Sequence, residues 1–593
     1  MWSLNPPGWG SFLLVGRMAG RLSISIGQCS DRGRKQTNQD FYGALVPEEP
    51  LLSLKGIAVV LADGISTSEF GAIASESAVK SLLTDYYCTP ESWSVKTSAQ
   101  RVIAATNSWL HSQTRRGSGR YDQDKGYVCT LSAMILKGTA AHIFHVGDSR
   151  IYRLAGTTLE QLTDDHRVVV SSGQSYLGRA LGVNPEIEID YRTFAAEKGD
   201  VFVLTTDGVH EQAGTRFVAH VLREAAADLD AAARTIVEEA YRRGSADNLT
   251  VQIVRVDDVP EGEAANILGR EELPLPPLLG ARELFDGYRI VREVHGSSRS
   301  HIYLAIDETS KAMVALKIPS IELRGDPAYI RRFTMEDWVA RRIDNAHVLR
   351  AGKSSRRRNY LYVVTEFIEG QTLTQWMIDN PKPPLETVRS VIEQIAKGLQ
   401  AFHRMEMLHQ DLRPDNVMID RTGTVKIIDF GATKVKGVAE AVPAMHGEDI
   451  LGTVQYTAPE YFLGEGGSAR SDIFSLGVIT YQMLTGRLPY GAQAAKVRTR
   501  SQLRKLRYAS ALDDNREIPA WIDATLRKAV HPDPAKRYEE LSEFVFDLRH
   551  PNSDSLVASA PLLERNPLLF WRCLSAFLAV LVFILLVVSY GGR

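Results

Sequence analysis

One short stretch of the sequence carries the side chains that phosphoryl transfer requires. Residues 407–431 contain two carboxylates, Asp411 and Asp429, together with the guanidinium of Arg413 and the amide of Asn416. Asp411 can accept a proton from an attacking hydroxyl, and Arg413 can stabilise charge on the transferred phosphoryl group. Asn416 and Asp429 offer the hard oxygen ligands that Mg²⁺ prefers. The stretch therefore predicts transfer of a phosphoryl group to a hydroxyl.

The order of these residues resembles the protein kinases, whose catalytic loop reads H-R-D-L-K-P-x-N and whose metal-binding turn reads D-F-G. The corresponding segments here are His409–Asn416, which reads H-Q-D-L-R-P-D-N, and Asp429–Gly431. The resemblance implies that Asp411 is the catalytic base and that Arg413 contacts the phosphoryl group. It also implies that Asn416 and Asp429 hold Mg²⁺ or Mn²⁺ beside ATP.

Further motifs extend this resemblance over residues 284–550, which implies a bilobal α+β kinase fold. The run V-A-L-K ends at Lys317, which the resemblance assigns to the α- and β-phosphates of ATP, with Glu336 as its expected partner. Glu366 and Ile368 follow an apolar strand and fit the hinge that binds adenine through backbone groups.

Two positions depart from the kinase pattern. Residues 295–302 read H-G-S-S-R-S-H-I where G-x-G-x-x-G-x-V is usual, and Ser297 is the candidate nucleotide contact in this altered loop. Side chains there limit how closely the backbone can cover phosphates. Gln410 replaces the arginine that commonly pairs with a phosphate on the activation segment. This replacement predicts a kinase that is active without phosphorylation of that segment.

A second group of carboxylates lies in residues 22–256, where short apolar runs adjoin acidic residues. Asp40, Asp63, Asp207 and Asp247 each occupy such a position. Taken singly, each is typical of a turn. Carboxylates collected at the ends of adjacent strands repel one another, and divalent cations offset that repulsion. The pattern predicts a metal centre at strand ends.

Together with the run G-D-S-R at Gly147–Arg150, this pattern resembles the metal-dependent (PPM-type, or type 2C) serine/threonine protein phosphatases. The resemblance implies an α-β-β-α sandwich with two or three Mn²⁺ or Mg²⁺ ions, and hydrolysis without a covalent enzyme intermediate. It assigns as metal ligands Asp40, Asp63, the Gly64 carbonyl, Asp207 and Asp247, with Asp148 and Glu211 at a weaker third ion.

The cation that binds the substrate phosphate is less clearly marked. Lys35 stands where these phosphatases usually place an arginine, and Arg34 beside it is a second candidate. A lysine lacks the bidentate fork of an arginine. We expect His145 and His166 to be packed or surface histidines rather than ligands.

Length and composition indicate the number of domains, the class of partner and the cellular compartment. A chain of 593 residues predicts about three or four domains. The formal charge of −2 argues against a nucleic-acid partner, and four widely spaced cysteines suit a reducing compartment. The predicted segments are a tail at 1–21, the phosphatase domain at 22–256, a linker at 257–283, the kinase domain at 284–550 and a juxtamembrane segment at 551–572.

Residues 573–590 form an apolar run with no formal charge, preceded by Arg565 and Arg572. It is just long enough to span a bilayer, and the positive flank favours a cytoplasmic N-terminal side. We expect a single-pass C-terminal anchor in the cell membrane, with the catalytic domains in the cytoplasm. The alternative is a buried helix.

The whole sequence predicts a bifunctional serine/threonine kinase and phosphatase whose partners are proteins bearing serine, threonine or their phosphorylated forms. Its own other domain is one candidate substrate. An alternative keeps the phosphatase active and makes the kinase domain a nucleotide-binding pseudokinase scaffold, because the glycine-rich loop is altered. A third hypothesis, a binding module with neither activity, leaves both sets of ligands unexplained.

Overall fold

The computed structural model of the chain describes residues 21–117, 125–169, 175–224, 228–260, 273–323, 326–352, 358–440, 455–514, 518–551 and 567–590. The chain divides into two compact units, which are considered separately. The first is Met1–Ile267 together with Lys436–Met445, and the second is Leu268–Val435 together with His446–Arg593.

Two five-stranded antiparallel sheets form the centre of the first unit, as far as its residues are described. The first sheet has the order β1 (Ser23–Asp31), β12 (Leu249–Asp258), β11 (Val201–Thr205), β6 (Arg150–Ala155) and β7 (Thr158–Gln161). The second has the order β10 (Asp190–Ala195), β5 (Ala140–Val146), β4 (Leu131–Lys137), β3 (Ile57–Asp63) and β2 (Asp40–Leu45). A hairpin of β8 (Arg167–Val169) and β9 (Ser175–Leu177) stands apart from both sheets.

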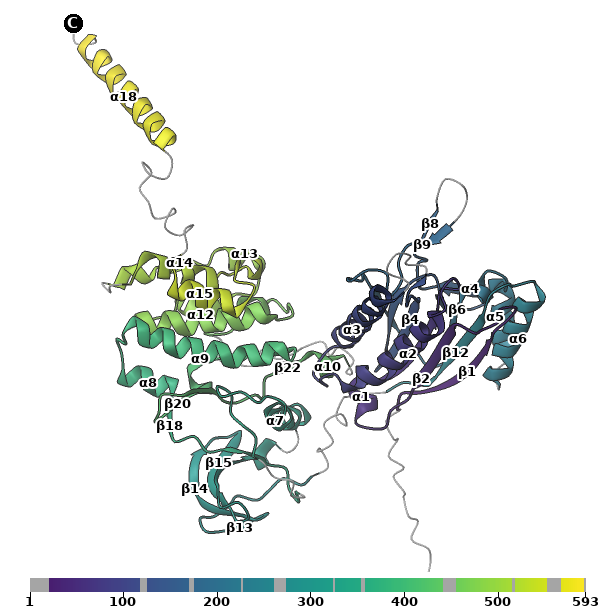
Figure 1. The fold of residues 1–593 in the computed structure, drawn as a ribbon. Helices are drawn as coiled ribbons and strands as arrows, with labels where there is room; N and C mark the ends of the chain where they lie inside the picture. Colours follow the sequence, from purple (N-terminus) through teal and green to yellow (C-terminus); the bar gives the residue numbers. More distant parts are fainter. Residues whose placement is uncertain are drawn as a thin grey trace, which may run out of the picture. The chain divides into compact units, whose positions relative to one another are not determined.

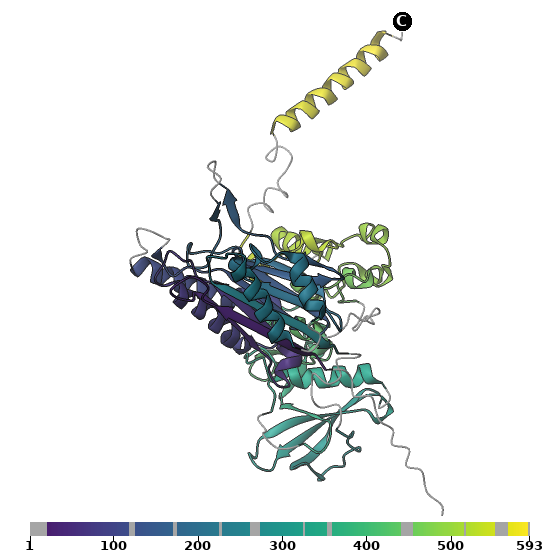
Figure 2. The same ribbon diagram turned by 90° about the vertical axis from the view of Figure 1, so that its right-hand side faces the viewer.

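Helices cover the outer face of each sheet (Figures 1 and 2). On the second sheet these are α2 (Gly71–Cys88) and α3 (Val95–Arg116), and on the first they are α5 (Thr215–Glu224) and α6 (Leu229–Arg242). The shorter helices are α1 (Leu51–Lys55), α4 (Asp207–His210) and α10 (Lys436–Ala439). This order of layers is the α-β-β-α sandwich that the sequence predicts.

Strand β3 shows why its sequence is apolar throughout. Alternate residues of a strand point to opposite faces. The odd-numbered residues of Ile57–Leu61 pack in the core between the two sheets, and the even-numbered residues of Ala58–Ala62 pack against α2 and α3. Because both faces are buried, the run lacks a polar alternation. The strand ends at Asp63, where the chain reaches the edge of this core.

The second unit has a five-stranded antiparallel sheet with one long helix beside it, within the described residues. The sheet order is β13 (Leu284–Phe285), β14 (Tyr288–Gly296), β15 (Ser300–Asp307), β16 (Met313–Pro319) and β17 (Val363–Glu366), and the helix is α7 (Pro327–Ala340). Asp326 caps α7 by accepting hydrogen bonds from the N–H groups of Ala328 and Tyr329.

A mainly helical lobe completes the second unit, and Figure 2 shows its green and yellow helices apart from the teal sheet. Its helices are α8 (Leu373–Asp379), α9 (Leu385–Arg404), α11 (Pro459–Phe462), α12 (Ala469–Thr485), α13 (Arg500–Arg504), α14 (Ala520–Ala529) and α15 (Leu541–Arg549). Small sheets pair β18 (Gly370–Thr372) with β20 (Val417–Asp420) and β21 (Val425–Ile427), and β19 (Met407–Leu408) with β22 (Lys434–Val435). The two lobes match the predicted kinase fold.

The predicted transmembrane helix at 573–590 is not supported. This run falls within helix α18 (Pro567–Tyr590). Among the residues that the structure describes, no helix is long and apolar enough to cross a membrane.

Candidate active sites

A cavity of about 1200 Å³ within the second unit brings together the residues predicted for the kinase site. Its lining includes Ser297, Lys317, Glu336, Glu366, Ile368, Asp411, Arg413, Asn416 and Asp429. Lys317 and Glu366 belong to strands of the sheet, Ser297 lies between β14 and β15, and α7 supplies Glu336. The segment before β20 supplies Asp411, Arg413 and Asn416, and Asp429 follows β21. A cavity of this size can hold a nucleotide.

The Lys317 ammonium on β16 joins two carboxylates in this cavity. Its Nζ lies 2.6 Å from Oε2 of Glu336 and 3.9 Å from Oδ1 of Asp429. Burial raises the pKa of Glu336 to about 7, although the charge of Lys317 opposes this shift. The charge of Lys317 holds the pKa of Asp429 below its usual value. Lys317 is thereby held at the wall of the cavity, where it can meet phosphate oxygens.

The catalytic loop places the predicted base beside its neighbours. Asn416, in the 3₁₀ turn Pro414–Asn416, donates from Nδ2 to the Asp411 carbonyl at 2.9 Å and to Asp411 Oδ2 at 3.1 Å. Arg413 Nε lies 4.0 Å from Asp411 Oδ2. Burial raises the pKa of Asp411, and the nearby positive charges oppose the rise. The arrangement leaves a carboxylate oxygen available to accept a hydroxyl proton.

Buried polar contacts hold this loop in position. Asp472 on α12 accepts hydrogen bonds from the N–H groups of His409 and Gln410, each at 3.1 Å, and pairs with His403 at 2.9 Å. Gln410 has a positive φ of 65°, and Asp472 supports this less common backbone conformation. Asp472 itself is buried. Its carboxylate therefore sets the backbone that presents Asp411.

The altered loop between β14 and β15 is stabilised by its own serine. Ser297 Oγ accepts hydrogen bonds from the N–H groups of Arg299 and Ser300, at 3.3 and 3.2 Å.

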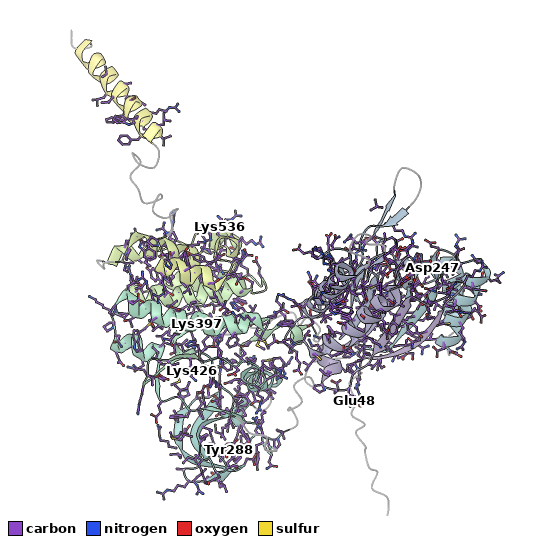
Figure 3. All side chains as sticks on the ribbon, in the orientation of Figure 1. Glu48, Asp247, Tyr288, Lys397, Lys426 and Lys536 are labelled. Atoms are coloured by element: carbon purple, nitrogen blue, oxygen red, sulfur yellow. The ribbon has the colours of Figure 1, made fainter. Side chains whose placement is uncertain are left out.

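At the hinge, Glu366 Oε1 accepts a hydrogen bond from Lys426 Nζ at 2.6 Å, and Figure 3 labels Lys426. The Glu366 carboxylate is thus engaged, which leaves backbone groups as the candidate contacts for the adenine that the sequence predicts at this hinge.

In the first unit, the predicted metal ligands lie where strands and short helices end. Asp40 begins β2 and Asp63 ends β3, and the two are direct partners in the β2–β3 register. Asp207 begins α4 and Glu211 follows it, while Asp148 lies between β5 and β6 and Asp247 precedes β12. The predicted ligands therefore come from several strand ends and turns of the same sandwich.

Gly64 follows Asp63 in a region of close backbone approach. A Cβ at this position would lie 2.3 Å from the carbonyl oxygen of Gly71 at the start of α2. Such a distance excludes any side chain without a shift of the backbone. The glycine therefore lets α2 approach the end of β3, beside Asp63.

Burial and mutual repulsion act on these carboxylates. Burial raises the pKa of Asp40 to about 6 and that of Asp207 to about 7. Burial also raises the pKa of Asp63 well above its usual value, and the charges of Asp40 and Asp207 add to the rise. A cluster of this kind stores repulsion that a cation relieves.

Two cations contact this cluster. Arg167 donates to Asp148 Oδ2 at 2.7 Å, to Glu211 Oε1 at 2.8 Å and to Asp207 Oδ2 at 3.1 Å. Lys35 Nζ lies 3.2 Å from Asp247 Oδ2. Sequence reasoning missed Arg167, because it lies outside the motifs that identify the other residues of this cluster.

The donor set fits a hard divalent cation. Oδ1 of Asp40 is buried and has no hydrogen-bond partner among the described residues, while Oδ2 accepts from the hydroxyls of Thr206 and Thr250. These threonines, which sequence reasoning also missed, fix the orientation of the carboxylate. In the described part of the chain, no three His, Cys, Asp or Glu side chains are placed to hold a metal ion. Arg167 and Lys35 contact four of the predicted ligands, Asp148, Asp207, Glu211 and Asp247.

The two histidines near this cluster have structural partners. His166 Nδ1 accepts the N–H of Gly147 at 3.0 Å, and its Nε2 lies 3.1 Å from Asp190. His145 Nδ1 shares a hydrogen bond with Ser132 Oγ at 2.9 Å. Both histidines are buried, as expected for packed residues rather than ligands.

Comparison with known protein families gives two matches. Residues 28–249 match the family described as protein phosphatase 2C, and residues 288–546 match the family described as protein kinase domain. The chain is 30% identical over 273 residues to the serine/threonine-protein kinase PrkC of Bacillus subtilis, which covers 46% of this chain and 41% of PrkC. It is 31% identical over 287 residues to PknA of Corynebacterium glutamicum, and the match covers 47% of this chain and 57% of PknA. The chain thus spans about half the length of these curated relatives.

Solved structures resemble each half in turn. One of them is PppA, described as a key regulatory component of T6SS in Pseudomonas aeruginosa, which is 25% identical to this chain with a TM-score of 0.33. The match covers 40% of this chain and 99% of PppA. The PknI kinase domain of Mycobacterium tuberculosis is 23% identical, with a TM-score of 0.36, 46% of this chain covered and 100% of that domain. The pseudokinase alternative gains no support from the relatives, which are named as kinases. The chain carries a protein phosphatase 2C domain and a serine/threonine protein kinase domain.

Proposed function

We propose that this chain is a bifunctional enzyme of reversible protein phosphorylation. The kinase domain transfers the γ-phosphoryl group of ATP to serine and threonine hydroxyls of proteins, and the phosphatase domain hydrolyses phosphoserine and phosphothreonine. The observation that carries the proposal is the pairing of Lys317 with Glu336 in the cavity that Asp411, Asn416 and Asp429 also line. These are the parts that phosphoryl transfer requires, and they lie in one place.

In the kinase domain, each residue has a distinct task. Lys317 holds phosphate oxygens while Glu336 fixes its ammonium in the cavity. Asp411 accepts the proton of the attacking hydroxyl, and Asn416 orients its carboxylate through the 3.1 Å hydrogen bond. Arg413, beside Asp411, offsets charge on the phosphoryl group as it moves. Asn416 and Asp429 would hold Mg²⁺ or Mn²⁺.

In the phosphatase domain, the clustered carboxylates would hold two or three Mn²⁺ or Mg²⁺ ions. The ligands are Asp40, Asp63, the Gly64 carbonyl, Asp207 and Asp247, with Asp148 and Glu211 for the third. When bound, such ions activate water and offset negative charge on the phosphoryl oxygens. Thr206 and Thr250 orient Asp40 by hydrogen bonds to its Oδ2. Lys35 lies beside Asp247, and in this proposal it binds the substrate phosphate.

Separate assays on the full chain test each half of this proposal. With ATP and Mg²⁺, the wild type should phosphorylate a serine/threonine peptide, and Asp411→Asn should lose about 1000-fold in rate while still binding nucleotide. With Mn²⁺, the wild type should hydrolyse a phosphopeptide, and Asp63→Asn should not. Equal peptide phosphorylation by the wild type and Asp411→Asn would refute the kinase assignment.

The cellular location is a separate proposal, supported by the uncharged run at 573–590 and the arginines before it. It places the chain at the cell membrane with both domains in the cytoplasm. Fractionation of cells expressing the full chain, with and without residues 567–593, tests it. Recovery of both forms in the same soluble fraction would contradict attachment through this segment.

A further inference from the structure

A segment of the kinase domain belongs to the first unit. Helix α10 (Lys436–Ala439) and Glu440 lie in sequence between Asp429 and Glu460, the bounds of the kinase activation segment. In space, Lys436–Met445 is part of the same compact unit as the phosphatase sandwich, and Figure 1 shows α10 beside α1. The contacts of this segment within the first unit are specific rather than incidental.

The backbone of α10 fits closely against the residues before α3. The N–H of Gly437 donates to the Ser92 carbonyl at 2.9 Å. A Cβ at position 437 would lie 2.6 Å from the carbonyl oxygens of both Glu91 and Trp93. Real side chains do not tolerate such distances, so this approach requires a glycine.

A buried lysine faces the same segment. Lys137, the last residue of β4, has a side chain that is 0% exposed. Its Nζ donates to the Gly437 carbonyl at 2.5 Å and to Glu440 Oε2 at 3.3 Å. Burial lowers the pKa of Lys137, and the charge of Glu440 opposes that shift. A buried ammonium requires acceptors and a counter-charge, and this segment supplies both.

Glu440 also completes the start of a long helix. Its Oε2 accepts the N–H of Val95, the first residue of α3, at 2.9 Å. The first turn of α3 contains no acidic residue of its own. A negative charge is stabilising at this end of a helix, because unpaired N–H groups and the helix dipole lie there.

We propose that Ser92, Val95 and Lys137 form a docking site on the phosphatase unit for residues 436–440, and that this docking anchors the kinase activation segment. Gln410 is neutral and cannot pair with a phosphate on that segment, so the docked residues 436–440 offer the segment a different anchor. The Gly437 and Glu440 contacts serve as that anchor. The inference rests on the proposed kinase activity for its functional part and on these contacts alone for the docking part.

Full-length variants test the docking directly. Gly437→Ala introduces the forbidden Cβ, and Glu440→Gln removes the charge without adding bulk. Gly466→Ala is the matched control, because a Cβ at Gly466 meets no atom within 4 Å. Hydrogen exchange is measured at the amides of Val95 and Gly437, alongside peptide phosphorylation and phosphopeptide hydrolysis.

We expect exchange at both amides to accelerate about tenfold or more in Gly437→Ala, and at Val95 in Glu440→Gln, with no change in Gly466→Ala. The rate of peptide phosphorylation should fall about fivefold or more in the first two variants, while phosphopeptide hydrolysis is retained. Unchanged exchange would overturn the docking site. Faster exchange with an unchanged or higher kinase rate would overturn the anchoring role. A wild type without kinase activity would refute the proposed function, and the exchange data would still decide the docking.

Discussion

The Lys35 ammonium lies 3.2 Å from Oδ2 of Asp247, whereas the guanidinium of the adjacent Arg34 lies over the ring of Tyr241, 5.4 Å from its centroid. Of the two cations that the sequence offers for binding the substrate phosphate, only Lys35 is therefore at the carboxylate cluster. Asp247 is labelled in Figure 3.

This difference predicts unequal effects of two substitutions. Lys35→Ala should lower kcat/KM for a phosphopeptide by about 10- to 100-fold, because a charge-assisted contact to phosphate is lost. Lys35→Arg should retain most activity, and Arg34→Ala should change it by less than about threefold. Steady-state hydrolysis by the three variants checks this. A larger loss in Arg34→Ala than in Lys35→Ala would contradict the assignment.

The contacts of Arg167 predict that the thermal stability of the phosphatase unit depends on metal binding. It contacts Asp148, Asp207 and Glu211 and is 29% exposed, so its removal should cost about 1 kcal/mol in metal-free protein. The melting temperature of the phosphatase unit should fall by about 2–4 °C in Arg167→Ala. Added Mn²⁺ should raise it more in this variant than in the wild type, because the ion replaces the lost positive charge. Equal stabilisation of both proteins by Mn²⁺ would count against metal binding at this cluster.

The Glu460–Arg537 pair should be the most costly ion pair to break in the second unit. Arg537 donates to both Glu460 oxygens at 2.8 Å, and the two side chains are 0% and 4% exposed. Arg537→Ala should reduce the free energy of unfolding by about 3–5 kcal/mol, because Glu460 remains buried and unpaired. Arg549→Ala, which breaks exposed contacts to Glu386 and Glu393, should cost at most about 1 kcal/mol. Thermal unfolding of the two variants measures the contrast, and equal losses would contradict the buried-pair argument.

Substitution of Thr433 tests whether the kinase needs phosphorylation at this position of its activation segment. The side chain is buried, with no hydrogen-bond partner for Oγ1 among the described residues. Thr433→Ala should therefore keep peptide phosphorylation within about twofold of the wild type. Loss of activity in this variant, restored by Thr433→Glu, would show that phosphorylation at this position is required.

Much of the fold and most of the candidate site follow from the sequence for definable reasons. The run at Ile57–Asp63 predicts a doubly buried strand ending in a carboxylate, because its apolar residues lack alternation. Asp411 and Asn416 are separated by a fixed spacing within one loop, so their proximity is local. The pairing of Lys317 with Glu336 also follows from the order of the motifs, and the structure places Lys317 Nζ 2.6 Å from Glu336 Oε2.

Other features depend on contacts between distant parts of the chain. Arg167 reaches carboxylates at positions 148, 207 and 211 only after the strands are assembled. Thr250 lies opposite Asp40 because β12 and β2 belong to facing sheets, and nothing near either residue in sequence signals that contact. Glu440 lies about 300 residues from Lys137, and its place in the first unit follows from tertiary packing that no local pattern encodes.

The central claim is that one chain carries two opposed activities. The most direct measurement follows labelled phosphate from ATP onto the chain itself, with Mg²⁺ and Mn²⁺ present, in the wild type, Asp63→Asn, Asp411→Asn and the double variant. The account predicts that label accumulates in Asp63→Asn well above the wild-type level, because hydrolysis is lost, and that Asp411→Asn and the double variant stay unlabelled. Label in the double variant equal to that in Asp63→Asn, or no label in any form, would contradict it.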